Sequence, residues 1–327
     1  MREVADHRLN SVTNFLCAGS AAAAARYPVN ALSVAKIYAQ TGTPGGKMGC
    51  SQTFYWVWRL HGQEGWARTA GLACSRLFVH YGIQFGLYDR LTKLRPPETA
   101  AQSIVTSFVC GAVVGPTSTL VTHPLDLLKV RLAIQPSYVG QHINGMQPWY
   151  SGGLADTVAT IVNSEGMYRG LYRGLGLSLV GSAVFCSTMF GLWDASVRFS
   201  ALRPNKKAYP FVLWEWFTLP LLSVGAAVVA SHPWDVIRRK YMAQSYVLPR
   251  EGTVDVKFRN LLECVKQIWR VNGPYGFYHG LWPNVLKIGP QLLTFWIVFK
   301  GLQGSFLTVN GSLNNPFQNF TGMGIYD

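Results

Sequence analysis

The sequence predicts an all-α membrane protein built from three repeats. Of its 327 residues, 49% are hydrophobic and only 13% are charged, and the mean hydropathy is positive at +0.15. Soluble domains carry about twice that share of charged residues. Six apolar stretches approach the ~20 residues that a helix needs to cross a bilayer, and one proline-centred motif recurs about every hundred residues. We therefore expect six transmembrane helices in three repeats.

The six candidate spans cover residues 10–39, 72–93, 101–132, 174–197, 214–243 and 281–303. Gly, Ser, Thr and Pro interrupt every span, which is typical of helices that pack on one another or line a cavity. Lys and Arg are concentrated in the long connections after the first, third and fifth spans, so the positive-inside rule places these connections on the inner side of the membrane. The net charge of +14 therefore indicates membrane topology rather than a nucleic-acid partner.

Two copies of the recurring motif are intact. Pro124 and Pro233 are each followed by an aspartate two residues later and by a basic residue five residues later. The aspartates are Asp126 and Asp235, and the bases are Lys129 and Arg238. An acid and a base at this spacing lie on one face of a helix, and a proline inside a helix is expected to kink it.

The first copy of the motif is degenerate. Pro28 stands where the other prolines stand, but Asn30 and Ser33 replace the acid and the base. The spacing of the three prolines predicts repeats at residues 1–98, 99–207 and 208–303, followed by a polar tail at 304–327.

Two further features recur in each repeat. Small residues four positions apart in the first span allow a close approach of helices; the pairs are Gly19 with Ala23, Gly111 with Gly115, and Gly225 with Val229. A short amphipathic segment precedes the second span, and the three segments end at Glu64-Gly65, Glu165-Gly166 and Asn272-Gly273.

These motifs resemble those of the mitochondrial carrier family. The match extends to about residue 303 and includes the lead-ins Thr122-His123-Pro124 and Ser231-His232-Pro233 and the steps Tyr172-Arg173-Gly174 and Tyr278-His279-Gly280. The resemblance implies a multi-pass protein of the mitochondrial inner membrane. It also implies six tilted helices around a pseudo-threefold axis, which enclose a water-filled cavity, and short amphipathic helices on the matrix side.

The resemblance implies a matrix gate of ion pairs between the acid of one motif and the base of the next. Asp126 is then expected to pair with Arg238. Lys129 would meet only Asn30, and Asp235 would meet only Ser33, so one ionic pair of three remains. Lys36 is an alternative partner for Asp235.

The resemblance also implies a cytoplasmic gate at the ends of the second, fourth and sixth spans. Its acids are Asp89 and Asp194, whereas Lys300 replaces the third acid. Lys93 and Arg198 follow the acids by four residues instead of the family's three, a spacing that favours pairs within one helix. Either these bases belong to the gate, or Lys93, Arg198 and Lys300 are interfacial anchors.

Two basic residues lie at equivalent mid-membrane positions, thirteen residues before Asp89 and Lys300. These are Arg76 and Lys287, and the equivalent position of the second repeat holds Gly181-Ser182. The three positions match the substrate contact points of the family. Bases at membrane depth are candidates for function, and because the spans offer no acid at this depth, the site is expected to attract a small anion. Alternatively, both bases are remnants in an unused cavity; Arg26, near Pro28, is a further candidate.

The sequence favours no enzyme, cofactor or metal site. It holds no phosphate-binding loop, nucleophile elbow or metal-ligand spacing, and its six cysteines are expected to be small buried thiols.

Two functions remain open. The first is alternating-access transport of a small anionic metabolite. The second is a transport-inactive subunit of a larger inner-membrane assembly, such as a respiratory-chain complex, held through residues 1–10 and 304–327. Inner-membrane lipids, with cardiolipin as one candidate, are expected partners in both cases.

Overall fold

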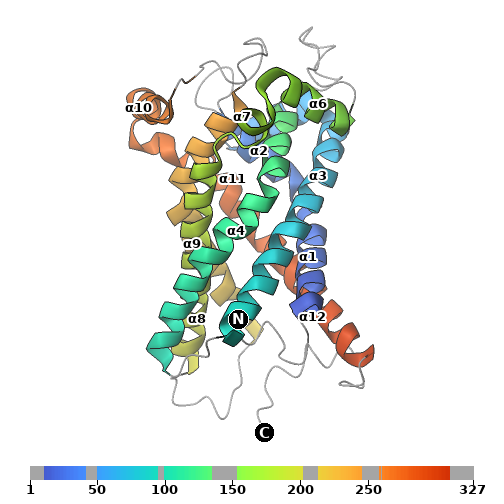
Figure 1. Ribbon diagram of the computed structural model, residues 1–327, viewed down its shortest axis with the longest axis vertical. Helices are drawn as coiled ribbons and strands as arrows, with labels where there is room; N and C mark the ends of the chain where they lie inside the picture. Colours follow the sequence, from blue (N-terminus) through green and yellow to red (C-terminus); the bar gives the residue numbers. More distant parts are fainter. Residues whose placement is uncertain are drawn as a thin grey trace.

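The computed structural model describes residues 11–41, 50–94, 99–134, 153–201, 213–244, 258 and 260–309, and within these ranges the regular structure is helical. The helices are α1 (Ser11–Arg26), α2 (Asn30–Thr41), α3 (Cys50–Leu94), α4 (Ala100–Ile134), α6 (Gly153–Glu165), α7 (Met167–Leu171), α8 (Leu175–Ala201), α9 (Leu213–Ala243), α10 (Leu261–Asn272), the 3-10 helix η1 (Pro274–Tyr278), α11 (Leu281–Leu286) and α12 (Ile288–Val309). The long helices run along the long axis of the molecule, and α6, α7 and α10 lie at the same end of it, with α10 on the other side from α6 (Figure 1). The structure thus confirms the predicted all-α class.

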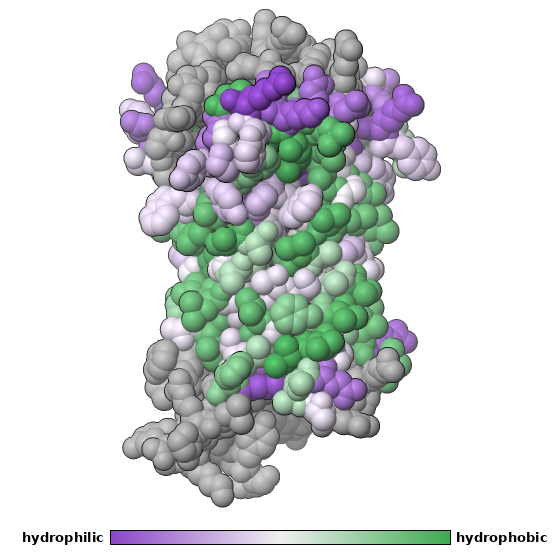
Figure 2. All heavy atoms as spheres, turned by 90° about the vertical axis from the view of Figure 1, so that its left-hand side faces the viewer, coloured by the Kyte–Doolittle hydropathy of each residue, from purple (hydrophilic) through white to green (hydrophobic). Residues whose placement is uncertain are grey.

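A hydrophobic belt surrounds the middle of the bundle on the face shown in Figure 2, between more hydrophilic ends. Val105, Val109 and Val113 on α4 are each more than half exposed, and their four-residue spacing places them on one outward face. Among the described residues, four stretches are long and apolar enough to cross a membrane: Ala100–Ile134, Met167–Phe199, Phe217–Ala243 and Ile288–Val309. These side chains face outward because lipid tails, rather than water, surround such a belt.

The first repeat differs from the other two in both of its spans. Its first span is divided, because α1 ends at Arg26 and α2 begins only after Pro28. Its second span is the 45-residue helix α3, so no separate amphipathic helix ends at Glu64-Gly65 as predicted. The other repeats break their chain at Gly174 and Gly280, with φ of 77° and 74°. Thr69 holds the equivalent place in the first repeat, because it lies seven residues before the mid-membrane residue Arg76. A β-branched residue does not adopt such a φ.

The last span is also divided, at Lys287, although the sequence predicts one helix over 281–303. Helix α11 ends at Leu286 and α12 begins at Ile288. Pro290 has no N–H to donate to the carbonyl of Leu286, four residues earlier, and its ring crowds that carbonyl. Lys287 therefore lies at a turn between two helices. Helix α12 continues to Val309, six residues past the predicted end of the third repeat.

Pro124 and Pro233 differ from Pro28, because α4 and α9 continue through them. The close approach predicted for the small residues occurs in two repeats. A Cβ atom added at Gly115 would lie 2.5 Å from the carbonyl oxygen of Ser182, and one added at Gly19 would lie 2.7 Å from that of Phe78. The prediction is wrong for Gly225, where an added Cβ would have no neighbour within 4 Å among the described residues.

Candidate functional site

A cavity of about 270 Å³ lies inside the helix bundle and brings most of the predicted site residues together. It is lined by Arg76, Gly181, Ser182, Lys287, Asp126, Lys129, Asp235 and Arg238. Its lining contains seven Lys or Arg side chains and two Asp, an excess of five positive charges. The seven bases are Arg26, Lys36, Arg76, Lys129, Arg238, Arg239 and Lys287.

Asp126 connects the mid-membrane site with the predicted matrix gate. Its Oδ2 lies 3.4 Å from Nη1 of Arg238, the pair that the sequence predicts. Its Oδ1 lies 3.2 Å from Nε of Arg76. The Arg76 Nε–H is not aligned for a hydrogen bond, so charge rather than hydrogen-bond geometry holds this contact. The expectation that Arg76 has no acidic partner is therefore wrong, because the long arginine side chain reaches from its own level to that of Asp126.

Asp235 is the most heavily paired acid of the cavity. Lys36 Nζ lies 2.5 Å from its Oδ2, and Arg238 Nη2 lies 2.9 Å from its Oδ1. Arg239 Nε also lies 3.2 Å from Oδ1. Ser33, the predicted partner, instead donates its hydroxyl to the carbonyl of Val29, just before its own helix. Lys36 lies three residues after Ser33, on the same helix face, and it supplies the positive charge that the motif lacks.

The third predicted gate contact, between Lys129 and Asn30, is not formed. The amide Nδ2 of Asn30 donates to the hydroxyl of Thr69 on α3, at 3.1 Å. Lys129 makes no hydrogen bond or ion pair with any residue in the described part of the chain, although it is only 5% exposed. The expected pair of Asp126 with Arg238 is thus formed, and the alternative pair of Lys36 with Asp235 adds a second ionic contact between the helices of the gate motifs.

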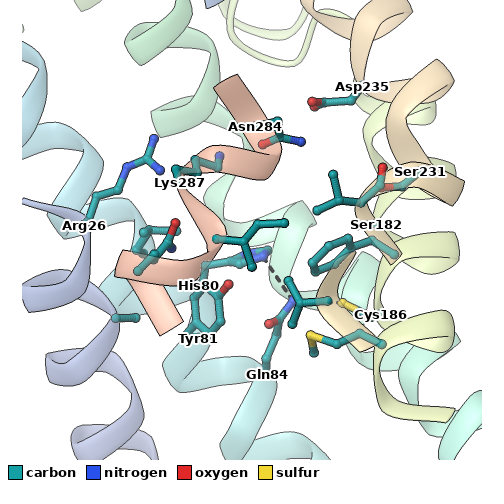
Figure 3. A pocket seen from close by; sticks show the side chains of 18 of the residues that line it. Arg26, His80, Tyr81, Gln84, Ser182, Cys186, Ser231, Asp235, Asn284 and Lys287 are labelled. Atoms are coloured by element: carbon teal, nitrogen blue, oxygen red, sulfur yellow. Dashed lines mark hydrogen bonds between the residues drawn. The ribbon is translucent and has the colours of Figure 1, made fainter. Parts of the chain in front are cut away.

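Three of the cavity bases have no carboxylate within 4.0 Å among the described residues. These are Arg26, Lys129 and Lys287. Arg26 is only 6% exposed, and its Nε has no hydrogen-bond partner in the described ranges. Arg26 enters the cavity from α1, and Lys287 enters it from the turn between α11 and α12 (Figure 3).

A chain of polar side chains from α3 also lines the cavity. Gln84 Nε2 lies 3.1 Å from His80 Nε2, and His80 Nδ1 lies 3.2 Å from Thr122 Oγ1. Because the Gln84 amide nitrogen only donates, His80 Nε2 accepts and the ring carries its proton on Nδ1. The sequence motifs did not mark His80 and Gln84 as site residues. Their spacing could have revealed them, since they follow Arg76 at four-residue intervals on one helix face.

The residues of the predicted cytoplasmic gate lie outside the cavity lining. Asp89 Oδ2 pairs with Lys93 Nζ at 2.8 Å, and Asp194 Oδ2 pairs with Arg198 Nε at 3.0 Å. Both pairs lie within one helix, as the four-residue spacing predicts. Lys300 is only 7% exposed, so the interpretation of this lysine as an interfacial anchor is wrong.

Aromatic rings join the helices between the cavity and these pairs. Phe85 on α3 lies 5.8 Å from Phe295 and 5.7 Å from Phe299, both on α12. Trp193 on α8 lies 6.2 Å from Trp296, also on α12. Distances of this size are those of favourable ring pairs. The contacts that join helices at this level are therefore largely apolar.

The opposite end of the second repeat contains a buried ionic cluster. Glu165 Oε2 lies 2.7 Å from Nη2 of Arg131 and 3.7 Å from Nη1 of Arg173, and all three side chains are at most 6% exposed. Arg131 Nη2 also donates to the carbonyl of Gln244, which follows α9. This cluster connects α4, the end of α6 and the end of α9.

His123 and His232 bind the backbone just before α8 and α11, respectively. His123 Nε2 lies 3.1 Å from the carbonyl oxygen of Arg173, and His232 Nε2 lies 3.0 Å from that of His279. A carbonyl only accepts, so each ring carries a proton on Nε2. Both histidines therefore have structural partners, and among the described residues no His, Cys, Asp or Glu cluster could hold a metal ion.

The sequence matches the family model for the mitochondrial carrier protein in three consecutive segments, residues 7–97, 100–202 and 212–310. Solute carrier family 25 member 43 of Mus musculus is 31% identical over 320 residues, which cover 95% of this chain and 87% of the mouse protein. An uncharacterized mitochondrial carrier of Saccharomyces cerevisiae is 27% identical over 300 residues, or 88% and 90% of the two chains. ADP/ATP translocase 3 of Homo sapiens is 32% identical over 177 residues, 54% of each chain. Because the three segments cover nearly its whole length, the chain belongs to the mitochondrial carrier family.

Proposed function

We propose that this carrier exchanges a small anionic metabolite across the mitochondrial inner membrane. As a member of its family it is a multi-pass transporter rather than an enzyme. We assign substrate contact to the mid-membrane residues Arg76, Gly181, Ser182 and Lys287. All four line the same cavity.

The excess of five positive charges in the cavity lining carries this proposal. A charge inside the membrane costs several kcal/mol unless water or a partner compensates it. The two aspartates compensate only part of the seven bases, so an anion that enters the cavity lowers the electrostatic energy of the whole site. A cation would raise that energy.

Two interhelical ion pairs serve as the matrix gate in this proposal. The ion pair between Lys36 and Asp235 connects α2 to α9, and the ion pair between Asp126 and Arg238 connects α4 to α9. On the cytoplasmic side, the ring contacts of Phe85 and Trp193 with α12 take the place of an ionic gate. Asp89 and Asp194 then stabilise helix ends, since each pairs within its own helix.

The second function, a transport-inactive subunit of a larger assembly, loses one of its grounds. That ground was a matrix gate with a single ion pair, and Lys36 restores a second pair. A protein partner was expected to bind through residues 1–10 and 304–327, and of these, residues 1–10 and 310–327 lie outside the described residues. We therefore favour transport.

Counter-exchange in proteoliposomes tests the proposal. Vesicles that contain the purified carrier and an unlabelled anion are supplied with the same labelled anion, for a panel of carboxylates and phosphates. We expect saturable exchange of at least one anion, and a loss of at least about tenfold in Lys287→Gln, since removal of a bound charge weakens charge-assisted contacts. Lys93→Gln is the matched control, because Lys93 pairs with Asp89 outside the cavity. Exchange of a cation in place of every anion would overturn the proposal.

A further inference from the structure

We propose that Arg26, Lys129 and Lys287 form the principal anion subsite of the cavity, and that this subsite takes the dianionic group of a phosphomonoester. The inference rests on the proposed function and names its substrate class. It differs from the site predicted from sequence, because Arg26 lies near the helix break of the first repeat and Lys129 belongs to the gate motif.

The seven bases of the cavity divide into two groups by their partners. Four of them share the two aspartates: Arg76 and Arg238 contact Asp126, while Lys36, Arg238 and Arg239 contact Asp235. The other three, Arg26, Lys129 and Lys287, have no carboxylate partner within the described residues. In the described part of the chain, no carboxylate lies within 4.0 Å of these three side chains to compete with an incoming anion.

Neighbouring positive charges act on these bases. Lys36, Arg26 and Lys129 repel the ammonium group of Lys287. Arg26 and Arg76 repel Lys129, which Asp126 attracts in part. Arg26 and Lys129 are at least nine-tenths buried and lie in the cavity wall. Buried charges of like sign without a partner are unfavourable, so the empty site favours a ligand that neutralises all three.

The number and origin of these bases indicate the charge of the ligand. They come from α1, from α4 and from the turn before α12, and hence approach the cavity from three directions. A phosphomonoester presents three terminal oxygens and a charge of about −1.5 to −2 at neutral pH. It can therefore accept a charge-assisted hydrogen bond from each base. A monocarboxylate carries only one negative charge, so it compensates less of the positive charge of the three bases.

The cavity also offers aromatic side chains to the remainder of the ligand. Tyr81, Phe85, Trp193, Phe295 and Trp296 line the cavity. Ring faces of this kind pack favourably against a flat ring. Phenyl phosphate and benzoate, which share a ring but differ in charge, are therefore suitable probes.

Thermal unfolding of the purified full chain in detergent tests the subsite without the need for transport. We expect phenyl phosphate to raise the unfolding midpoint in a saturable way, with an apparent affinity at least about tenfold higher than that of benzoate. Arg26→Gln and Lys129→Gln should each lower the apparent affinity for phenyl phosphate by about tenfold or more, whereas Lys93→Gln should leave it unchanged. The conservative variants Arg26→Lys and Lys129→Arg should restore most of the affinity.

Two results would overturn the inference. One is equal stabilisation by benzoate and phenyl phosphate in the unaltered protein, a comparison that stands even if a glutamine variant fails to fold. The other is full phenyl phosphate affinity in folded Arg26→Gln and Lys129→Gln. Stabilisation that depends on these bases, without exchange in proteoliposomes, would contradict transport but keep the subsite. Anion exchange that is indifferent to Arg26 and Lys129 would contradict the subsite alone.

Discussion

The buried ionic cluster around Glu165 gives a prediction of stability that can be worked out in advance. Glu165→Gln preserves the shape of the side chain but removes the negative charge that faces Arg131 and Arg173. The Glu165 carboxylate and the Arg131 guanidinium are 4% and 3% exposed. Neither arginine can regain full hydration, so the substitution leaves buried positive charge poorly compensated.

The expected loss of unfolding free energy follows from the burial of this ion pair. Removal of one partner from a buried ion pair costs about 3–5 kcal/mol. At roughly 2 °C per kcal/mol for a chain of this size, the thermal unfolding midpoint should fall by about 6–10 °C. The measurement is the unfolding midpoint of the purified carrier in one detergent at constant lipid content.

Asp194→Asn is the matched control for this variant. It removes one carboxylate from a pair with Arg198 whose side chains are 17% and 32% exposed. Local pairs of this kind contribute only about 0.3–0.5 kcal/mol, so the midpoint should move by about 1 °C or less. Equal shifts in the two variants would refute the reasoning that burial decides the cost.

Three further predictions concern packing, the gate and a thiol. Gly115→Ala should destabilise the carrier by about 2 kcal/mol or more in the thermal unfolding assay, because its Cβ would lie 2.5 Å from a backbone oxygen. Gly225→Ala, where the added Cβ has open space, should be neutral or stabilising in the same assay. A double-mutant cycle of Lys36→Met and Asp235→Leu should give a coupling energy of at least about 0.5 kcal/mol, and additive effects would contradict the pair. Burial raises the pKa of the Cys264 thiol to about 11, so iodoacetamide at pH 8 should modify Cys264 only after unfolding, as read by mass spectrometry.

The sequence predicted the fold because its signals are local and repeated. Apolar length, the proline motif and the spacing of Asp126 and Arg238 all depend on helix geometry, which a sequence reveals directly. The missing amphipathic helix of the first repeat was also readable in principle. Thr69 occupies the place of Gly174 and Gly280, and a β-branched residue cannot make their turn.

The pairing inside the cavity was harder to predict, because it depends on the reach of long side chains between helices. Lys36 reaches Asp235 from a position that no motif marks, and Arg76 extends to Asp126 from another level of the bundle. Sequence spacing assigns a residue to a level and a face. It does not show how far a lysine or arginine extends, so Lys36 could be named only as an alternative partner of Asp235, and the contact of Arg76 with Asp126 was not foreseen.

Anion counter-exchange by the reconstituted carrier tests the central claim most directly. With phenyl phosphate, inorganic phosphate and carboxylates compared in the same vesicles, we predict saturable exchange of an anion that Lys287→Gln reduces by at least about tenfold and Lys93→Gln leaves unchanged. The contradicting result is a folded carrier that exchanges none of these anions, or exchanges one equally well without the Lys287 charge.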